Sequence, residues 1–90
     1  MGIILDESRV IKTLEKLPKW LRAAYSVWRR VLLDDGFEGL RDVKGFHLEK
    51  LKGWRTGQYS CRLNRGYRVI FLQDADKVLV IVLEVNKHGY

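Results

Sequence analysis

The rest of the chain is organised around residues 57–71, with the sequence GQYSCRLNRGYRVIF, in which two short segments of alternating apolar and polar residues flank a turn that contains glycine. This pattern is typical of a β-hairpin with one buried and one solvated face. A three-residue loop over 64–66 would place Arg62 opposite Arg68 on the solvated face, whereas a two-residue turn would mix the faces. Two arginines opposite each other on a sheet repel, so the sequence predicts a bound anion between them.

The composition is that of one small globular domain, which we expect to span residues 1–90. The chain is 47% apolar, with three tryptophans and one proline, unlike a disordered segment. Its formal net charge of +6 implies attraction to an acidic partner. On charge alone, nucleic acid, an anionic membrane surface and an acidic protein all satisfy this condition.

Cysteine content and hydropathy indicate the compartment. The single cysteine, Cys61, cannot form an internal disulfide, and no C-x-x-C pair is present to bind zinc. The first residues lack the basic region and long apolar run of a signal peptide, and no stretch approaches the roughly 18 apolar residues of a membrane-spanning helix. We therefore expect a cytoplasmic protein that does not bind membranes.

The segment before the hairpin predicts a strand and two helices. Residues 3–5 are expected to form an edge strand, followed by Asp6 and Ser8 as helix caps. Helical spacing begins at Arg9, and Pro18 is expected to be the first residue of a second helix. This second helix carries an apolar stripe that should pack on the sheet, formed by Leu21, Ala24, Tyr25, Trp28 and Leu32.

The remaining segments complete an α+β fold. The second helix should end at residues 34–36, and residues 37–53, which hold three glycines and no sustained period, predict a loop with at most one turn of structure. Residues 78–85 form an apolar run broken only by Glu84, which predicts a central strand covered on both faces. The predicted order is β-α-α-β-β-β, with the two N-terminal helices packed on one face of a small antiparallel sheet.

Several residues that could carry chemistry flank the hairpin. Glu49 and Lys52 lie just before it, and His88 and Tyr90 follow the last predicted strand. A carboxylate, an imidazole and fixed cations suit metal-free cleavage of RNA through its own 2′-hydroxyl, which needs a base, an acid and stabilisation of the phosphorane. Arginine stays protonated, so the hairpin arginines can only position and stabilise. Glu49 and His88 are therefore the titratable candidates.

Each of these residues also has a simpler interpretation. A lone glutamate in a basic protein is more often a surface ion-pair partner, and a lone histidine near a C-terminus is more often idle in solvent. Tyr90 either stacks on a base or packs on the sheet. His47-x-Glu49 matches the first part of a zinc-deaminase signature, but the Pro-Cys-x-x-Cys that must follow is missing. We therefore predict neither a metal site nor a cofactor.

Three motifs together resemble the RelE/ParE superfamily of bacterial toxins, and within it the RelE, YoeB and HigB-like ribosome-dependent mRNA interferases. The motifs are HLEKLKG at 47–53, QYSCRLNRGYRVIF at 58–71 and LEVNKHGY at 83–90. The resemblance covers essentially the whole chain. It implies two N-terminal helices on an antiparallel sheet, and an endoribonuclease that cleaves mRNA in the ribosomal A site beside rRNA. It also implies that a cognate antitoxin silences the toxin.

The resemblance implies roles for individual residues. Glu49 matches the general base of YoeB-like toxins and His88 the general acid, although Gly89 separates His88 from Tyr90 where those toxins have the two side by side. Ser60 stands where RelE has a lysine, which favours a mechanism based on glutamate and histidine. The implied catalytic residues are Glu49, Arg62, Arg68, His88 and Tyr90. Substrate binding is assigned to Lys52, Arg55, Arg65 and Lys87.

Two other functions stay open on the sequence. One is a ParE-like toxin that inhibits gyrase and cleaves no RNA, although that branch lacks an acid and base pair equivalent to Glu49 and His88. The other is a catalytically silent member that only binds an antitoxin or RNA. The sequence does not determine the oligomeric state.

Overall fold

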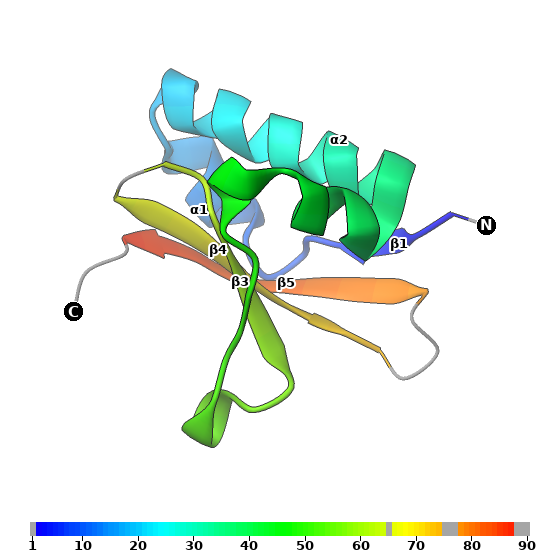
Figure 1. The fold of residues 1–90 in the computed structure, drawn as a ribbon. Helices are drawn as coiled ribbons and strands as arrows, with labels where there is room; N and C mark the ends of the chain where they lie inside the picture. Colours follow the sequence, from blue (N-terminus) through cyan, green and yellow to red (C-terminus); the bar gives the residue numbers. More distant parts are fainter. Residues whose placement is uncertain (1, 65, 75–77, 88–90) are drawn as a thin grey trace.

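The computed structural model describes residues 2–64, 66–74 and 78–87 (Figure 1). The strands are β1 (Ile4–Asp6), β2 (Glu49–Lys50), β3 (Gln58–Arg62), β4 (Tyr67–Gln73) and β5 (Leu79–Lys87). The helices are α1 (Ile11–Lys16) and α2 (Lys19–Asp42), with two short 3-10 turns, η1 (Lys44–Phe46) and η2 (Gly53–Arg55). The predicted α+β class is confirmed.

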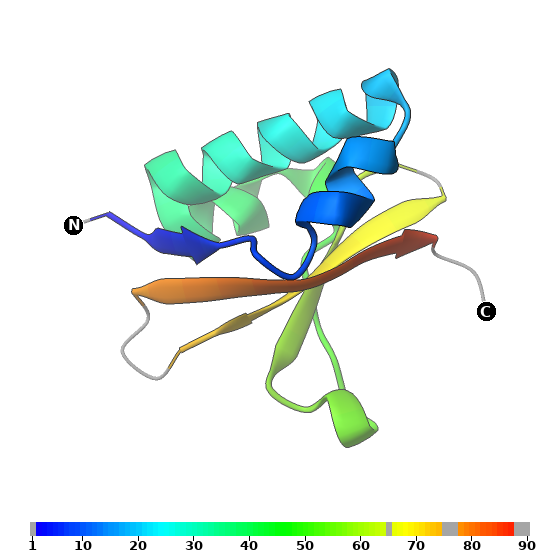
Figure 2. The same cartoon turned by 180° about the vertical axis from the view of Figure 1, so that it is seen from behind.

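The five strands form one sheet in the order β1-β5-β4-β3-β2. All neighbours are antiparallel except the edge strand β1, which pairs parallel with β5. Both helices lie over the same face of the sheet, as the two opposite views show (Figures 1 and 2). None of the described helices covers the other face, which we call the open face. Its side chains on β3, β4 and β5 include Gln58, Ser60, Arg62, Arg68, Ile70, Leu72, Glu84 and Asn86.

The hairpin formed by β3 and β4 has the predicted register. Arg62 pairs with Arg68 and Cys61 with Val69, so the loop between the two strands has the predicted length. Asn64 stabilises this loop, because its side-chain oxygen accepts hydrogen bonds of 2.9 Å from the backbone N–H groups of residues 66 and 67.

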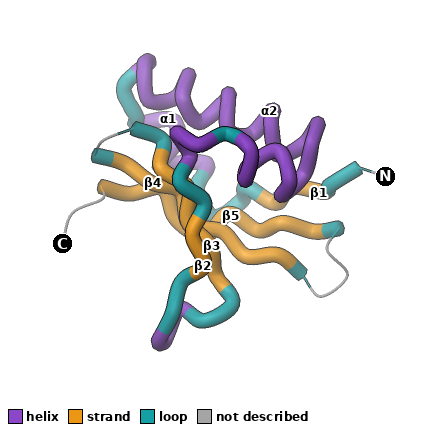
Figure 3. Tube along the Cα trace, in the orientation of Figure 1, coloured by secondary structure: helices purple, strands orange, loops and turns teal. Residues whose placement is uncertain are grey.

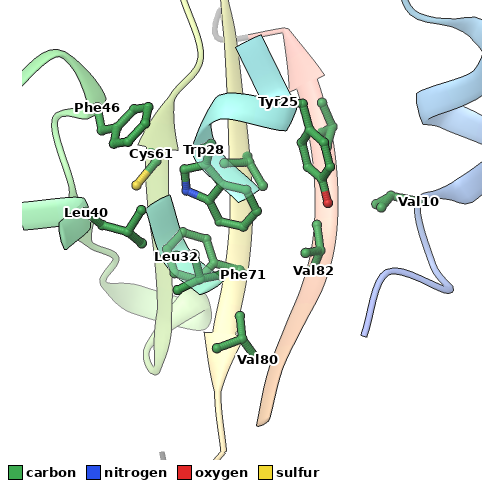
Figure 4. Packing of buried hydrophobic residues seen from close by; sticks show 12 residues of the cluster. Val10, Tyr25, Trp28, Leu32, Leu40, Phe46, Cys61, Phe71, Val80 and Val82 are labelled. Carbon is green, nitrogen blue, oxygen red and sulfur yellow. The ribbon is translucent and has the colours of Figure 1, made fainter. Parts of the chain in front are cut away.

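The core lies between α2 and the helix-covered face of the sheet. The predicted stripe on α2 is confirmed, since Leu21, Tyr25, Trp28 and Leu32 are buried and Ala24 is half-buried. Trp28 packs on Phe71 of β4 with ring centroids 5.2 Å apart, and Figure 4 shows the two rings in the middle of the buried cluster. Burying each large apolar side chain contributes about 1.5–3 kcal/mol, so this stripe is the main reason that α2 stays on the sheet.

A polar contact connects α2 to the turn after β1. The Tyr25 hydroxyl donates to Glu7 at 2.6 Å, and Arg29 Nε lies 3.1 Å from the same carboxylate. Burial and this hydrogen bond raise the pKa of the Tyr25 hydroxyl, so it remains a donor. The contact fixes the N-terminal strand relative to the long helix.

The predicted helix starts are wrong by a few residues. Asp6 closes a turn instead of capping a helix: its carboxylate accepts from the Ser8 backbone N–H at 2.9 Å and from the Ser8 hydroxyl at 2.7 Å. The residue that precedes α1 is Val10, which has no side-chain cap. Pro18 precedes α2 as its N-cap, because its ψ of 151° is extended and not helical.

The prediction of a loop over 37–53 is also wrong for most of that segment. At Gly36 the backbone adopts φ 67° and ψ −159°, which bends the chain, and the helix then resumes to Asp42. Leu40 and Phe46 are buried and anchor the following residues on the core. Residues 49–50 form β2 at the edge of the sheet.

The last strand is internal but is covered on one face only. Val82 and Val85 are buried on the helix side, whereas Leu83 and Glu84 are only half-buried. The register between β4 and β5 shifts here, because Ile70 pairs with Glu84 whereas Phe71 pairs with Val82. Leu83 is therefore an extra residue, a β-bulge, and the alternation of faces restarts after it. The bulge lets both valines face the core while Glu84 faces outward.

Candidate functional site

The paired arginines lie on the open face, in a row that crosses three strands. Arg62 pairs with Arg68, which in turn pairs with Asn86 of β5. Arg62 is exposed and Arg68 is half-buried. Strands are about 4.8 Å apart, so the row presents two guanidinium groups and an amide along one line, an arrangement that suits an anionic group.

A second row lies next to the first and begins with the predicted base. Glu49 on the edge strand β2 pairs with Ser60, which pairs with Ile70, which pairs with Glu84. Glu49 is exposed and is diagonal to Arg62, a position about 7–8 Å away between Cα atoms. The fold thus brings Glu49, Arg62 and Arg68 together on one face, although 13 and 19 positions separate the arginines from the glutamate in sequence (62 − 49 and 68 − 49).

Arg55, predicted to bind substrate, extends over the open face from the η2 turn. It donates to Gln58 of β3 and to Glu84 of β5, both at 2.8 Å. Asn86 donates to the other oxygen of Glu84 at 2.6 Å. By register, the guanidinium crosses β4 close to Ile70, which is fully buried although it faces away from the helices. Arg55 therefore covers part of the open face and adds a third fixed cation to it.

Glu84 and Asn86 lie on this face but were not among the predicted site residues. The sequence feature that could have identified Glu84 is that it is the one charged residue in the apolar run 78–85. Its outward direction depends on the bulge, which hydropathy does not reveal.

Trp54 was also missed, and it is the most exposed large apolar side chain among the described residues, at 83%. The carbon at the centre of the Arg55 guanidinium lies 4.3 Å from the centroid of its ring. The turn that carries both residues lies at the tip of the β2–β3 hairpin, on the side of the sheet away from α2 (Figure 3). An indole at this position has a cation on one side and is otherwise open to solvent.

The other predicted site residues are distributed differently. Lys52 is exposed and directly precedes η2. Lys87 pairs with Tyr67, next to the Arg68–Asn86 pair. Because side chains alternate along a strand, the Lys87 side chain leaves the sheet on the helix-covered face. Arg65, His88 and Tyr90 lie outside the described residues.

Two further titratable residues are not part of the two rows. Cys61 is buried in the core, and burial raises the pKa of its thiol to about 12, so it is protonated and unreactive near neutral pH. His47 is exposed at the end of η1 with a left-handed φ of 49°. Within the described ranges, no group of three or more His, Cys, Asp or Glu side chains is placed to hold a metal ion. The helices described there are also too short or too polar to cross a membrane.

No family model and no curated protein sequence matches the chain, but solved structures do. The archaeal RelE of a RelE–RelB complex from Pyrococcus horikoshii has 28% identity, covers 99% of this chain and 98% of its own, and gives a TM-score of 0.74. A mutant of Escherichia coli RelE in the free state has 27% identity over 97% of this chain and 84% of its own, with a TM-score of 0.67. The YoeB–YefM complex of Staphylococcus aureus gives a TM-score of 0.71 at 20% identity, over 97% and 98% of the two chains.

Two helices on one face of a five-stranded, mostly antiparallel sheet match the fold of these RelE-like toxins. The similarity extends over the full length of the domain and reaches 28% identity. The chain belongs to the RelE/ParE toxin superfamily.

Proposed function

We propose that this protein is the toxin of a type II toxin–antitoxin system and acts as a ribosome-dependent endoribonuclease that cleaves mRNA without a metal ion. The observation that carries the proposal is the position of Glu49 beside the Arg62–Arg68 pair on the open face. A carboxylate next to two fixed cations is the arrangement that base-catalysed transfer at a phosphodiester requires.

In the proposed reaction, the RNA supplies its own nucleophile. Glu49 accepts the proton of a 2′-hydroxyl, and that oxygen attacks the adjacent phosphorus. Arg62 and Arg68 stabilise the extra negative charge of the phosphorane. His88 gives a proton to the departing 5′-oxygen, so the products are a 2′,3′-cyclic phosphate and a 5′-hydroxyl.

Other residues hold the substrate in this proposal. Lys52, Arg55, Arg65 and Lys87 contact the RNA backbone, and Tyr90 stacks on a base. The partners are mRNA in the ribosomal A site, the neighbouring rRNA and a cognate antitoxin, all in the cytoplasm. The antitoxin complexes named for the RelE and YoeB structures support an antitoxin partner.

Substitutions on the open face test this proposal. Glu49→Gln should reduce cleavage about 100-fold to 10,000-fold, because it removes the general base. Arg62→Ala or Arg68→Ala should each reduce it about 100-fold to 1,000-fold, because each removes stabilisation of the phosphorane. The measurements are growth after induction and primer extension on mRNA from induced cells, where cuts should fall within translated codons.

Matched controls come from α2, which carries exposed residues of the same types. Glu38 and Arg41 are both exposed, and Glu38→Gln and Arg41→Ala should leave growth arrest unchanged. If Glu49→Gln arrests growth as strongly as the unmodified toxin, the assignment of the base is wrong. DNA-damage signalling without cuts in mRNA would instead identify a gyrase inhibitor. The absence of both effects would identify a catalytically silent member that only binds an antitoxin or RNA.

A further inference from the structure

The exposed Trp54 is the least explained feature of the open face. A large apolar ring at 83% exposure costs free energy in water, since it leaves its apolar surface hydrated. Nothing in the proposed cleavage step uses it. Trp20, the other exposed tryptophan, lies on α2 and contacts Tyr67 edge to face at 6.4 Å, whereas the described ring contact of Trp54 is with the Arg55 guanidinium.

The turn beneath Trp54 is held by several hydrogen bonds. Thr56 contacts the Gly53 carbonyl twice, through its hydroxyl at 2.6 Å and its backbone N–H at 3.1 Å. Gly53 has φ 69°, a conformation that side chains disfavour. Arg55 is fixed by Gln58 and Glu84, and its side chain is only 17% exposed. The indole is thus backed by a cation that is itself immobilised, which lowers the entropy cost of placing a ligand on the ring.

The surroundings of the ring select the class of ligand. Lys52 and Arg55 are its close neighbours in the chain, and Lys52 is exposed. Glu84 lies two residues along β5 from Asn86, so the end of Arg55 that reaches Glu84 is roughly 7 Å from the arginine row. An open aromatic face among cations fits a flat group that carries negative charge, which is the chemistry of a nucleotide in single-stranded nucleic acid.

We propose that Trp54, backed by Arg55, is a stacking site for one unpaired nucleobase of the RNA strand whose phosphate lies at the Arg62–Arg68 pair. The inference rests on the proposed function, because it takes RNA as the ligand. It adds a binding contact on the hairpin tip, separate from the stacking assigned to Tyr90. The guanidinium supports one face of the indole and the base occupies the other.

Binding of an uncleavable oligonucleotide tests the site without any need for catalysis. The probe is a short single-stranded 2′-O-methyl RNA, which lacks the attacking hydroxyl, with a fluorescent label for anisotropy. Trp54→Ala should weaken binding about 5-fold to 150-fold, the range for the loss of one base–aromatic stack, whereas Trp54→Phe should retain most of the affinity. Trp20→Ala is the matched control and should bind as the unmodified protein does.

An abasic nucleotide provides the decisive comparison. Moved through the probe, it should weaken binding at one position in the unmodified protein and have no such effect at that position in Trp54→Ala, because the stack is already lost. In a Trp20→Phe protein, titration with the intact probe should quench the emission of the exposed Trp54. Circular dichroism establishes that each variant is folded.

Equal affinity of Trp54→Ala and the unmodified protein would overturn the proposal, and would assign the exposed ring to a protein partner instead. The same conclusion follows if the abasic nucleotide weakens binding to the unmodified protein and to Trp54→Ala equally at every position. Failure of the proposed function is separate: induced cells would show no mRNA cuts, whereas the binding measurement with the uncleavable probe would be unaffected.

Discussion

Arg55 and Glu84 show how single residues connect distant parts of this chain. The guanidinium of Arg55 joins a turn at the hairpin tip to β5, with an N–O distance of 2.8 Å and side chains that are 17% and 40% exposed. Gln58 and Asn86 complete the network from two different strands. The carboxylate of Glu84, together with the Gln58 side chain, therefore orders a cation on the open face.

A double-mutant cycle measures this contact. Arg55→Ala and Glu84→Ala should show a coupling free energy of about 0.5–1 kcal/mol in urea unfolding, because the pair is partly exposed and screened by solvent. Pairing Arg55→Ala with Glu38→Ala, an exposed glutamate on α2, should give no coupling. Equal coupling in both cycles would mean that the bridge does not form in solution.

The long helix α2 consists of two helical segments with a glycine between them. Gly36 has φ 67° and ψ −159°, a region that only glycine occupies without strain. The second segment then packs close to the first: a Cβ built on Gly39 would overlap the Cβ of Asp35 and lie 3.0 Å from a methyl group of Val31. Both glycines are needed for the segment that leads to β2, and therefore for the position of Glu49.

Alanine substitutions test the requirement for glycine in α2. Gly36→Ala should lower the free energy of unfolding by about 1–3 kcal/mol through backbone strain, and Gly39→Ala by about 1–3 kcal/mol through overpacking. Gly45→Ala is the control, because a Cβ there would meet no heavy atom within 4 Å. Chemical denaturation gives the three values, and a Gly36→Ala protein as stable as the Gly45→Ala protein would contradict the kink.

At the scale of the whole molecule, the sheet separates two environments. The helix-covered face buries Trp28, Phe71 and Cys61, and the open face presents the arginine row. Cys61 and Arg62 are consecutive in β3, and alternation sends one to the core and the other to solvent. The same strand thus supplies stability on one side and charge on the other.

Burial of Cys61 makes the stability of the whole molecule depend on pH. The folded state raises the pKa of this thiol from 9.0 to about 12, so between these values the unfolded chain loses a proton that the folded chain keeps. The free energy of unfolding should therefore fall above pH 9, by at most about 1.4 kcal/mol per pH unit. Urea unfolding between pH 8 and pH 10 measures this fall.

Cys61→Ala is the comparison for the pH effect. This variant should be less stable at every pH because it loses buried volume, but its stability should change less between pH 8 and pH 10. The window ends at pH 10 because Tyr25, whose pKa is also raised, begins to ionise in the unfolded chain there. Parallel curves for the two proteins would show that the thiol does not cause the fall.

The hairpin, its register and the core stripe of α2 follow from the amino-acid sequence alone. These features depend on local rules: side chains alternate along a strand, a loop of fixed length sets the pairing, and apolar residues recur with the helical period. The same rules placed Arg62 opposite Arg68. Glu49 became a candidate base for other reasons, namely its titratable side chain before the hairpin and the resemblance to YoeB-like toxins. The local rules did not predict the helix starts or the structure of residues 37–53. The pattern predicted that the helix ends at residues 34–36, whereas the helix bends at Gly36 and continues to Asp42.

Local sequence patterns do not predict the parallel pairing of β1 with β5, the bulge at Leu83 or the contact between Arg55 and Glu84. Each of these features depends on residues far apart in the sequence, and its energy comes from packing and hydrogen bonds that no local pattern encodes. The bulge is the clearest case. Without the extra residue, alternation from Val82 would direct Glu84 into the apolar core, where an unpaired carboxylate is too costly to bury. With it, Glu84 lies on the open face and holds Arg55 under the exposed ring of Trp54.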